Sequence, residues 1–251
     1  MRTRIRTRTA DRAPLPAAAA PVATADVPQL LRLLHLASPA LPIGAFHFSQ
    51  GLEYAVEAGW VRDEASALEW IDGIAHASLA TLDLPVLQRL QAAWMREDHA
   101  DVLRWNAFLI ACRETDELRL EDRHLGAALL RVLAELDLTT GLFPITASNI
   151  RTALTHATAF GFACARWRID PLAALQTYGW AWAENQVLAA VKLVPLGQSA
   201  GQRMLHSLSS RLGSYSAQAM EVLDSDIGIS TALQSIASGR HETQYTRLFR
   251  S

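Results

Sequence analysis

The sequence predicts an all-α fold, a single-domain bundle of about ten helices with no significant sheet. Alanine and leucine dominate a chain of 251 residues, half of which are hydrophobic. Both are strong helix formers, and the β-branched residues that favour strands are relatively scarce. Apolar residues recur at the spacing of a helix face, and no convincing run alternates with the period of a strand.

The first 28 residues predict a disordered extension rich in Arg, Ala and Pro. They contain five arginines, two aspartates and four prolines without an apolar period. A solvated tail is the simplest interpretation, while a grip on an anionic surface and an organelle transit peptide remain open. Residues 29–240 are then predicted to form the helical domain, and residues 241–251 a C-terminal tail that docks onto a partner.

The helical domain is expected to open with a short apolar helix and a shaped loop. The helix covers 29–37 and ends before Pro39. Pro42 and Gly44 exclude regular structure from the loop, because proline lacks an N–H donor and glycine permits unusual dihedral angles. A helix is expected to resume over 46–58.

Four amphipathic helices are predicted next. Asp63 has the residue type and position of an N-cap. Asp83 followed by Pro85 marks another start, since proline is tolerated in the first turn of a helix. The predicted helices run from Asp63 through Leu79, from Asp83 onward, over 98–112 and over 115–136.

Gly141 and Pro144 interrupt the pattern before the last group of helices. Asp170-Pro171 and the turn from Pro195 to Gly197 separate its members. The predicted spans are 149–166, 171–194, 199–223 and a short helix over 230–237.

Charge and cysteine content limit the classes of partner. The net charge of −2 predicts neither nucleic acid nor a membrane surface as a partner. Cys112 and Cys164 lie far apart, so reduced, buried thiols in a cytoplasmic protein are expected. No apolar run reaches the ~18–20 residues that a membrane span needs.

Chemical motifs are largely missing from the sequence. No nucleotide-binding glycine motif occurs, and the eight histidines never pair three or four residues apart, so neither a cofactor nor a metal site is predicted. His47 in the loop is the best single candidate ligand. One acidic group is interpreted as a solvated or salt-bridged helix face; it comprises Glu114, Glu117 and Glu121, beside Arg113 and Arg119.

Lys192 is the only lysine of the chain and lies in an apolar stretch. Three hypotheses compete for it. It could be a Schiff-base amine, since an apolar site disfavours the charged form, or a contact for a partner. It could also be a cation that complements the C-terminal dipole of its helix.

Four segments, with Thr155–Gly161 (THATAFG) as a weaker fifth match that has Ala157 where the family often has proline, together resemble the urease accessory protein UreF family. The loop from Ser38 to Glu53 is similar to that family's S-P-x-x-P-x-G-x-F-x-x-S-x-G-L-E pattern. The other three are Arg113–Arg119 (RETDELR), Ala183–Gln198 (AENQVLAAVKLVPLGQ) and the chain end, His241–Ser251 (HETQYTRLFRS). The resemblance covers residues 29–251 in the same order and leaves only the arginine-rich extension outside it.

The resemblance implies a non-enzymatic, all-helical chaperone for assembly of the nickel site of urease. It implies a homodimer that binds the UreD/UreH accessory protein and recruits the GTPase UreG, in a complex with apo-urease in which GTP hydrolysis drives nickel insertion. The implied partner-binding residues fall into two groups. The tail group, which would dock onto UreD/UreH, is Tyr245, Arg247, Phe249 and Arg250. The second group, which would serve a surface that faces the GTPase or one that spans the dimer, is Lys192, Glu114, Pro195, Gly197 and Gln198. A Schiff-base enzyme that uses Lys192 is the alternative.

Overall fold

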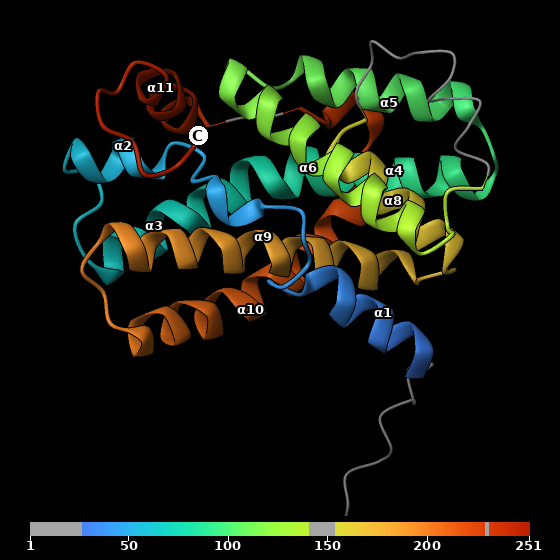
Figure 1. Ribbon diagram of the computed structural model, residues 1–251, viewed down its shortest axis with the longest axis horizontal. Coiled ribbons are helices and arrows are strands. Elements are labelled where there is room, and N and C mark those ends of the chain that lie inside the picture. The colour runs from blue at the N-terminus through green and yellow to red at the C-terminus, as the bar shows by residue number, and fades with distance from the viewer. Residues whose placement is uncertain (1–26, 141–153, 229–230) are drawn as a thin grey trace, which may run out of the picture.

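The computed structural model describes residues 27–140, 154–228 and 231–251. Every regular element in these ranges is helical and none is a strand (Figure 1), so the predicted all-α class is confirmed. The predicted extension over 1–28 lies outside the described residues except for Val27 and Pro28, which already belong to the first helix.

The described elements follow one another with short connections. The first part contains α1 (Val27–Ala37), the 3-10 turn η1 (Ala45–His47), α2 (Leu52–Glu57), α3 (Glu64–Ile74), the π-helical η2 (Ala75–Asp83), α4 (Leu84–Met95), α5 (His99–Ala111) and α6 (Asp116–Glu135). The second part contains α8 (His156–Arg166), α9 (Pro171–Leu193), α10 (Gln198–Glu221), η3 (Asp224–Asp226) and α11 (Ala232–His241).

Side-chain caps set where several helices begin. Asp63 accepts a hydrogen bond from the Ser66 N–H at 2.8 Å, and the two residues form a capping box, so the predicted cap is confirmed. Thr115, Thr155 and Asp170 cap α6, α8 and α9 in the same way. These caps satisfy N–H groups that have no partner within the helix.

Several predicted boundaries are wrong, among them the end of the last helix, which runs on to His241 rather than ending at Ala237. Asp83 starts no helix, because α3, η2 and α4 run on without a break; its dihedral angles are helical and its side chain makes no cap. The predicted helix over 46–58 is divided by Gln50 and Gly51, whose φ angles of 54° and 84° are left-handed. Of the predicted helix over 149–166, residues 149–153 lie outside the described residues.

Helix α9 runs through the middle of the molecule along its long axis (Figure 1). It packs against α1 and α10 on one side and against α4 and α8 on another. The largest fully buried side chains of the core include Phe160, Leu52, Ile71 and Leu87. Helices α2 and α11, the chain end and the turn between α9 and α10 lie at the same end of the molecule.

Helices α6 and α8 approach so closely that one glycine is required between them. A Cβ atom on Gly126 would lie 2.0 Å from the carbonyl oxygen of Leu154 and 2.7 Å from the carbonyl carbon of Thr155. Both neighbours are backbone and cannot move aside as a side chain would.

No helix in the described part of the chain is both long and apolar enough to cross a membrane.

Candidate functional site

Lys192 lies where the loop of residues 38–53 meets the chain end. Its ammonium group is 5.8 Å from the ring centre of Phe46 and 5.6 Å from that of Phe249. A cation over an aromatic face is attracted by the ring quadrupole. Three segments far apart in the sequence therefore meet at Lys192, in the last turn of α9.

The loop owes its shape to left-handed residues. Gly44 has φ +77°, and Gly51 has φ +84° with its Cα so close to α11 that a Cβ would lie 2.8 Å from the Ser238 nitrogen. Gln50 adopts φ 54° although it is not glycine. Its side chain holds this conformation by accepting from Trp182 Nε1 at 2.9 Å and donating to Glu121 at 2.8 Å.

The chain end packs against the body of the protein. Phe249 is 6% exposed and Ser251 is 0% exposed. The main-chain oxygen of Ser251 accepts from the Ser49 N–H at 2.6 Å, and the Arg250 N–H donates to the His47 carbonyl at 2.7 Å. Phe249 and Ser251 are therefore part of the packed body of the protein, although they belong to the segment expected to dock onto a partner.

Two carboxylates and a buried histidine hold this end in place. Glu53 accepts hydrogen bonds from the N–H groups of Leu248 at 2.7 Å and Phe249 at 2.8 Å. The His241 ring lies between Glu53, at 3.1 Å from Nε2, and Glu117, at 2.8 Å from Nδ1. We call this cluster, with Arg247 bound to Glu117 at 2.9 Å, the tail clamp.

The tail clamp favours the charged form of its histidine. Burial by itself lowers the pKa of His241, but the hydrogen bonds to Glu117 and Glu53 outweigh burial, and the pKa is raised above its ordinary value. An imidazolium donates from both ring nitrogens, which matches one carboxylate at each nitrogen.

The interpretation of Glu117 and Glu121 as a solvated face is wrong, since they are 7% and 5% exposed.

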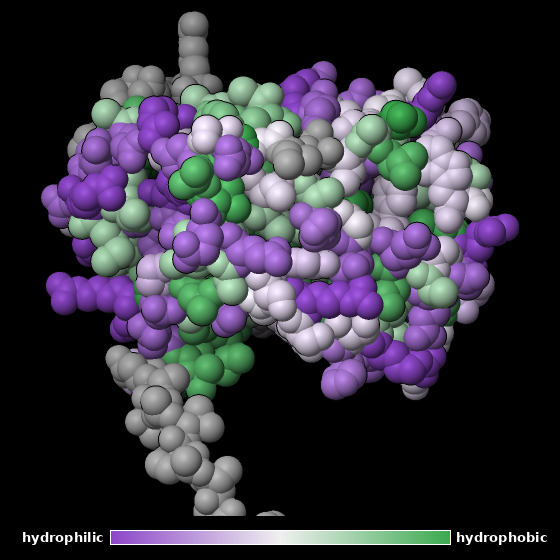
Figure 2. Space-filling view, turned by 180° about the vertical axis from the view of Figure 1, so that it is seen from behind, coloured by the Kyte–Doolittle hydropathy of each residue, from purple (hydrophilic) through white to green (hydrophobic). Residues whose placement is uncertain are grey.

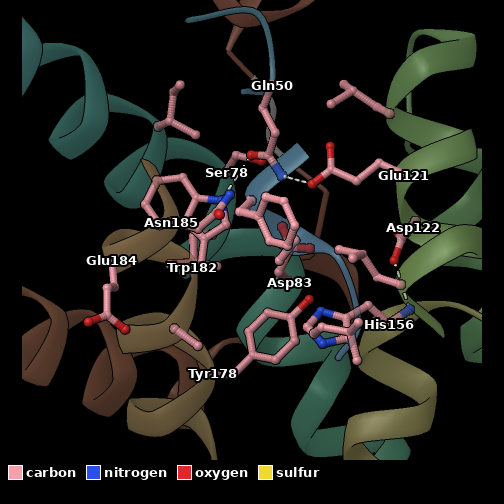
Figure 3. Close-up of a pocket in the computed structure, with 18 of the residues that line it drawn as sticks. Gln50, Ser78, Asp83, Glu121, Asp122, His156, Tyr178, Trp182, Glu184 and Asn185 are labelled. Atoms are coloured by element: carbon pink, nitrogen blue, oxygen red, sulfur yellow. Dashed lines mark hydrogen bonds between the residues drawn. The ribbon is translucent and has the colours of Figure 1, made fainter. Parts of the chain in front are cut away.

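A cavity of about 120 Å³ lies beside the clamp, between the loop, η2, α6 and α9 (Figure 3). Arg113 spans it, bound to Asp83 from η2 and at 2.9 Å to Asp122 from α6. π-Helical segments are rare and are often found at functional sites. Asp122 also accepts the His156 N–H at 2.9 Å and so ties the start of α8 to this wall.

Burial shifts the ionisation of the cavity walls. It raises the pKa of Glu121 to about 7, although Gln50 and Ser251 donate to the carboxylate. It lowers the pKa of His156 to about 4, so this ring is neutral at neutral pH. Burial likewise raises the pKa of Asp83 and of the Tyr178 hydroxyl.

Comparison with known proteins gives the family. The family model UreF matches residues 61–209. The chain is 48% identical over 221 residues to "Urease accessory protein UreF" of Alkalilimnicola ehrlichii, a match that covers 88% of this chain and 95% of that relative. The chain belongs to the urease accessory protein UreF family. It is also 50% identical over 224 residues to the protein of that name from Azoarcus sp. strain BH72, with 88% and 95% covered.

The structure separates the residues that the UreF resemblance singled out in the tail. Tyr245 is fully exposed, and Arg250 is exposed beside the buried Phe249. Arg247 points its guanidinium to Glu117 and keeps an exposed fraction of 41% for its side chain. In the tail of this UreF-family chain, Tyr245 and Arg250 thus face outward, while Phe249 and the guanidinium of Arg247 face the body of the protein.

The second group of predicted partner-binding residues does not form a single cluster. Lys192, Pro195, Gly197 and Gln198 are exposed at the α9–α10 end, and Gly197 has open space around it and an ordinary φ of −77°. Glu114 is exposed too, but it lines the cavity, whose lining does not include Lys192. The structure brings Lys192 to the tail and gives no contact between Lys192 and Glu114.

Sequence reasoning did not single out Glu53 and His241, the two clamp residues at the centre of the cluster in this UreF-family chain. Glu53 is the last residue of the loop motif and His241 is the first residue of the tail motif, so both belong to segments that resemble the family. The sequence did not show that these two residues contact each other in the folded chain. Within the described ranges no group of three or more His, Cys, Asp or Glu side chains is arranged to hold a metal ion.

The setting of Lys192 does not favour Schiff-base chemistry. Its side chain is exposed against two aromatic rings rather than enclosed in an apolar pocket. A Schiff-base lysine attacks a carbonyl inside a pocket that holds the substrate, and the lining of the cavity does not include Lys192.

Proposed function

We propose that this protein is a non-enzymatic scaffold for maturation of the urease nickel centre. In this role it holds the UreD/UreH accessory protein and the GTPase UreG together with apo-urease, so that GTP hydrolysis drives nickel insertion. Membership of the UreF family and the names of its relatives support the role. We expect the complex to assemble in the cytoplasm, where free thiols such as Cys112 and Cys164 stay reduced.

The observation that supports this proposal best is the shape of the chain end. The tail clamp fixes the backbone of the tail, so that Tyr245 and Leu248 point outward with 103% and 67% exposure. Exposed tyrosine and arginine are enriched among residues that dominate binding energy. We assign Tyr245, Arg247 and Arg250 to direct contact with UreD/UreH, and Phe249 to holding the tail in the conformation that the partner meets.

The surface at Lys192 adjoins the tail through Phe249. We assign Lys192, Pro195, Gly197 and Gln198 to a neighbouring contact with UreG, and Glu114 to the same assembly through the rim of the cavity. Adjacent surfaces for two partners would let one chain bring them together, which is what a scaffold requires.

Reconstitution with purified partners tests the tail. The protein is mixed with UreD/UreH and UreG, and complexes are separated by size-exclusion chromatography. Tyr245→Ala should weaken binding of UreD/UreH at least ~10-fold while the fold stays intact, because the side chain touches nothing in its own chain. Leu233→Ala, an exposed apolar residue of α11 outside the tail, is the matched control. An unchanged complex after removal of residues 242–251 would refute the tail assignment.

Lys192 needs a functional readout in the assembled complex. The GTPase rate of UreG and the activation of urease are compared for wild type, Lys192→Ala and Lys192→Arg. If shape as well as charge matters, Lys192→Arg is impaired too, because a guanidinium replaces a compact ammonium. Wild-type rates in both variants would remove Lys192 from the partner surface.

We also propose that the protein forms a homodimer through α1. The apolar side chains of Val27, Leu31 and Leu34 on this helix are between 58% and 62% exposed, and Figure 2 shows hydrophobic surface where the helix leaves the body. Beside it lies a largely apolar groove between α1, α9 and α10 that includes Trp180. A ridge next to a groove can be self-complementary across a twofold axis.

Light scattering tests this dimer. Leu31→Asp should shift the protein to monomer, because a charge would be buried in the interface. Leu120→Asp changes a leucine on α6 that is equally exposed, at 60%, and should leave the mass unchanged. A monomeric wild-type protein would refute the dimer. A Leu31→Asp protein that stays dimeric would show that the dimer contact lies elsewhere than α1.

A further inference from the structure

The cavity beside the tail clamp has an unbalanced charge. Five carboxylates and one guanidinium line it; they are Asp83, Glu114, Glu121, Asp122 and Glu184 against Arg113. Arg113 is bound to both Asp83 and Asp122, so one charge of that group remains uncompensated. The interior therefore attracts positive charge even when Glu121 holds a proton.

Two hydroxyl groups in this cavity have no hydrogen-bond partner among the described residues. Tyr178 is 6% exposed and Ser78 is 7% exposed, and both line the cavity. The hydroxyl of Tyr178 points toward Asp83 and His156 (Figure 3). Neither oxygen is among the enclosed polar atoms of the described residues that lack a partner, so both hydroxyls open into the cavity and can bond whatever fills it, water or a ligand.

The size of the cavity limits the occupant. At about 120 Å³ it is somewhat smaller than a cavity of ~150 Å³ that admits benzene, which leaves room for about five or six non-hydrogen atoms. Each oxygen of Asp83 and Asp122 accepts one hydrogen bond from the protein and can accept another. The walls thus offer acceptors and hydroxyls to a small donor.

We propose that this cavity is a binding site for a small cation that donates N–H hydrogen bonds, of the size of methylammonium or guanidinium. Asp83 and Asp122 supply the acceptors and the negative potential, and the hydroxyls of Tyr178 and Ser78 complete the set. A metal ion fits less well, because the described side chains provide no group of three ligands arranged around one point. The exposed Pro39 and Glu114 mark the mouth through which the cation enters.

Calorimetric titration of the full chain with methylammonium and with guanidinium chloride tests the site, at an ionic strength held constant with tetramethylammonium chloride. That ion has no N–H group to donate, so it cannot make the hydrogen bonds that the site requires. For ligands of two to four non-hydrogen atoms we expect a dissociation constant of about 0.1–10 mM. Tyr178→Phe and Ser78→Ala should each weaken binding ~5-fold, the effect of one hydrogen bond.

Tyr215→Phe is the matched control, because it removes a hydroxyl bound to Asp72 on another face of the protein. Three results would overturn the proposal. The first is no saturable binding, which would leave the cavity to water. The second is equal binding by Tyr178→Phe, Ser78→Ala and the control. The third is tighter binding of Ni²⁺ that the same two substitutions abolish, which would make the cavity a metal site.

Discussion

The Glu53 carboxylate is 3.1 Å from Nε2 of His241, a residue 188 positions away in the sequence. The same carboxylate accepts the backbone N–H groups of Leu248 and Phe249. One side chain of α2 thereby fixes both the end of α11 and the tail that follows it. The stability of the tail should depend on this carboxylate more than on any apolar contact of the tail.

Replacing Glu53 by Ala should release the tail. The change leaves His241 buried with one carboxylate and leaves two backbone N–H groups without their acceptor, at a cost of about 2–4 kcal/mol. Unfolding in urea measures the cost, and limited proteolysis at Arg247 and Arg250 reports release of the tail. Glu57→Ala, an exposed change in the same helix, should alter stability by less than ~0.5 kcal/mol. A protected tail in Glu53→Ala would contradict the clamp.

The contribution of His241 should fade in alkaline solution. Its folded pKa is raised above 6.5 by Glu117 and Glu53, so the stabilisation is complete below about pH 6.5 and is lost as pH rises through the folded pKa. Unfolding free energies of wild type and His241→Gln should therefore converge as pH rises above about 6.5. His206→Gln, exposed on α10, is the control. A difference that grows with pH would reverse the assignment.

Glu121 should act in the opposite sense to an ordinary ion-paired acid. Burial raises its pKa from 4.5 to about 7, so the folded protein holds the proton more tightly than the unfolded chain. Wild type should lose stability relative to Glu121→Gln as pH rises from about 4.5 to 7, by roughly 1–3 kcal/mol in all. The same series on the exposed Glu57→Gln should be flat. A flat series for Glu121→Gln would mean that the carboxylate is not desolvated.

Lys192 should contribute to docking of the tail through charge alone. Lys192→Ala removes a cation from the rings of Phe46 and Phe249, worth about 0.5–1 kcal/mol at an exposed site. Lys192→Arg keeps the cation and should keep the tail equally protected from protease. If only Lys192→Ala loosens the tail while both variants impair the partner assays, docking and partner contact are separate properties of this residue.

Gly126 should tolerate no side chain. Gly126→Ala places a methyl group against the backbone of Leu154 and Thr155, which should cost about 3 kcal/mol or more. Gly73→Ala makes the same change in α3, where nothing lies within 4 Å, and should be neutral or stabilising by up to ~1 kcal/mol. Thermal unfolding of the two variants should differ accordingly, and similar midpoints would show that α6 and α8 can separate.

The helices could largely be predicted because their signals are local. Asp63 caps the helix as its residue type predicted, Thr115 caps the helix that was expected to begin there, and α9 and α10 end within two residues of the predicted limits. The prediction for Asp83 failed because an aspartate shortly before a proline is typical of a helix start whatever its tertiary contacts are. In the folded chain its carboxylate has a stronger partner, Arg113, which is 30 residues away.

The sequence by itself determined the helical class, most helix positions and the resemblance to UreF, since each depends on residue type and short spacing. Only the tertiary structure decided that Glu53, Glu117 and Glu121 are buried and hold the chain end, because their partners at that end lie 124 or more residues away. A carboxylate on a helix face has the same local pattern whether it meets water or a returning segment. The free energy that distinguishes the two comes from contacts that exist only after the chain has closed on itself.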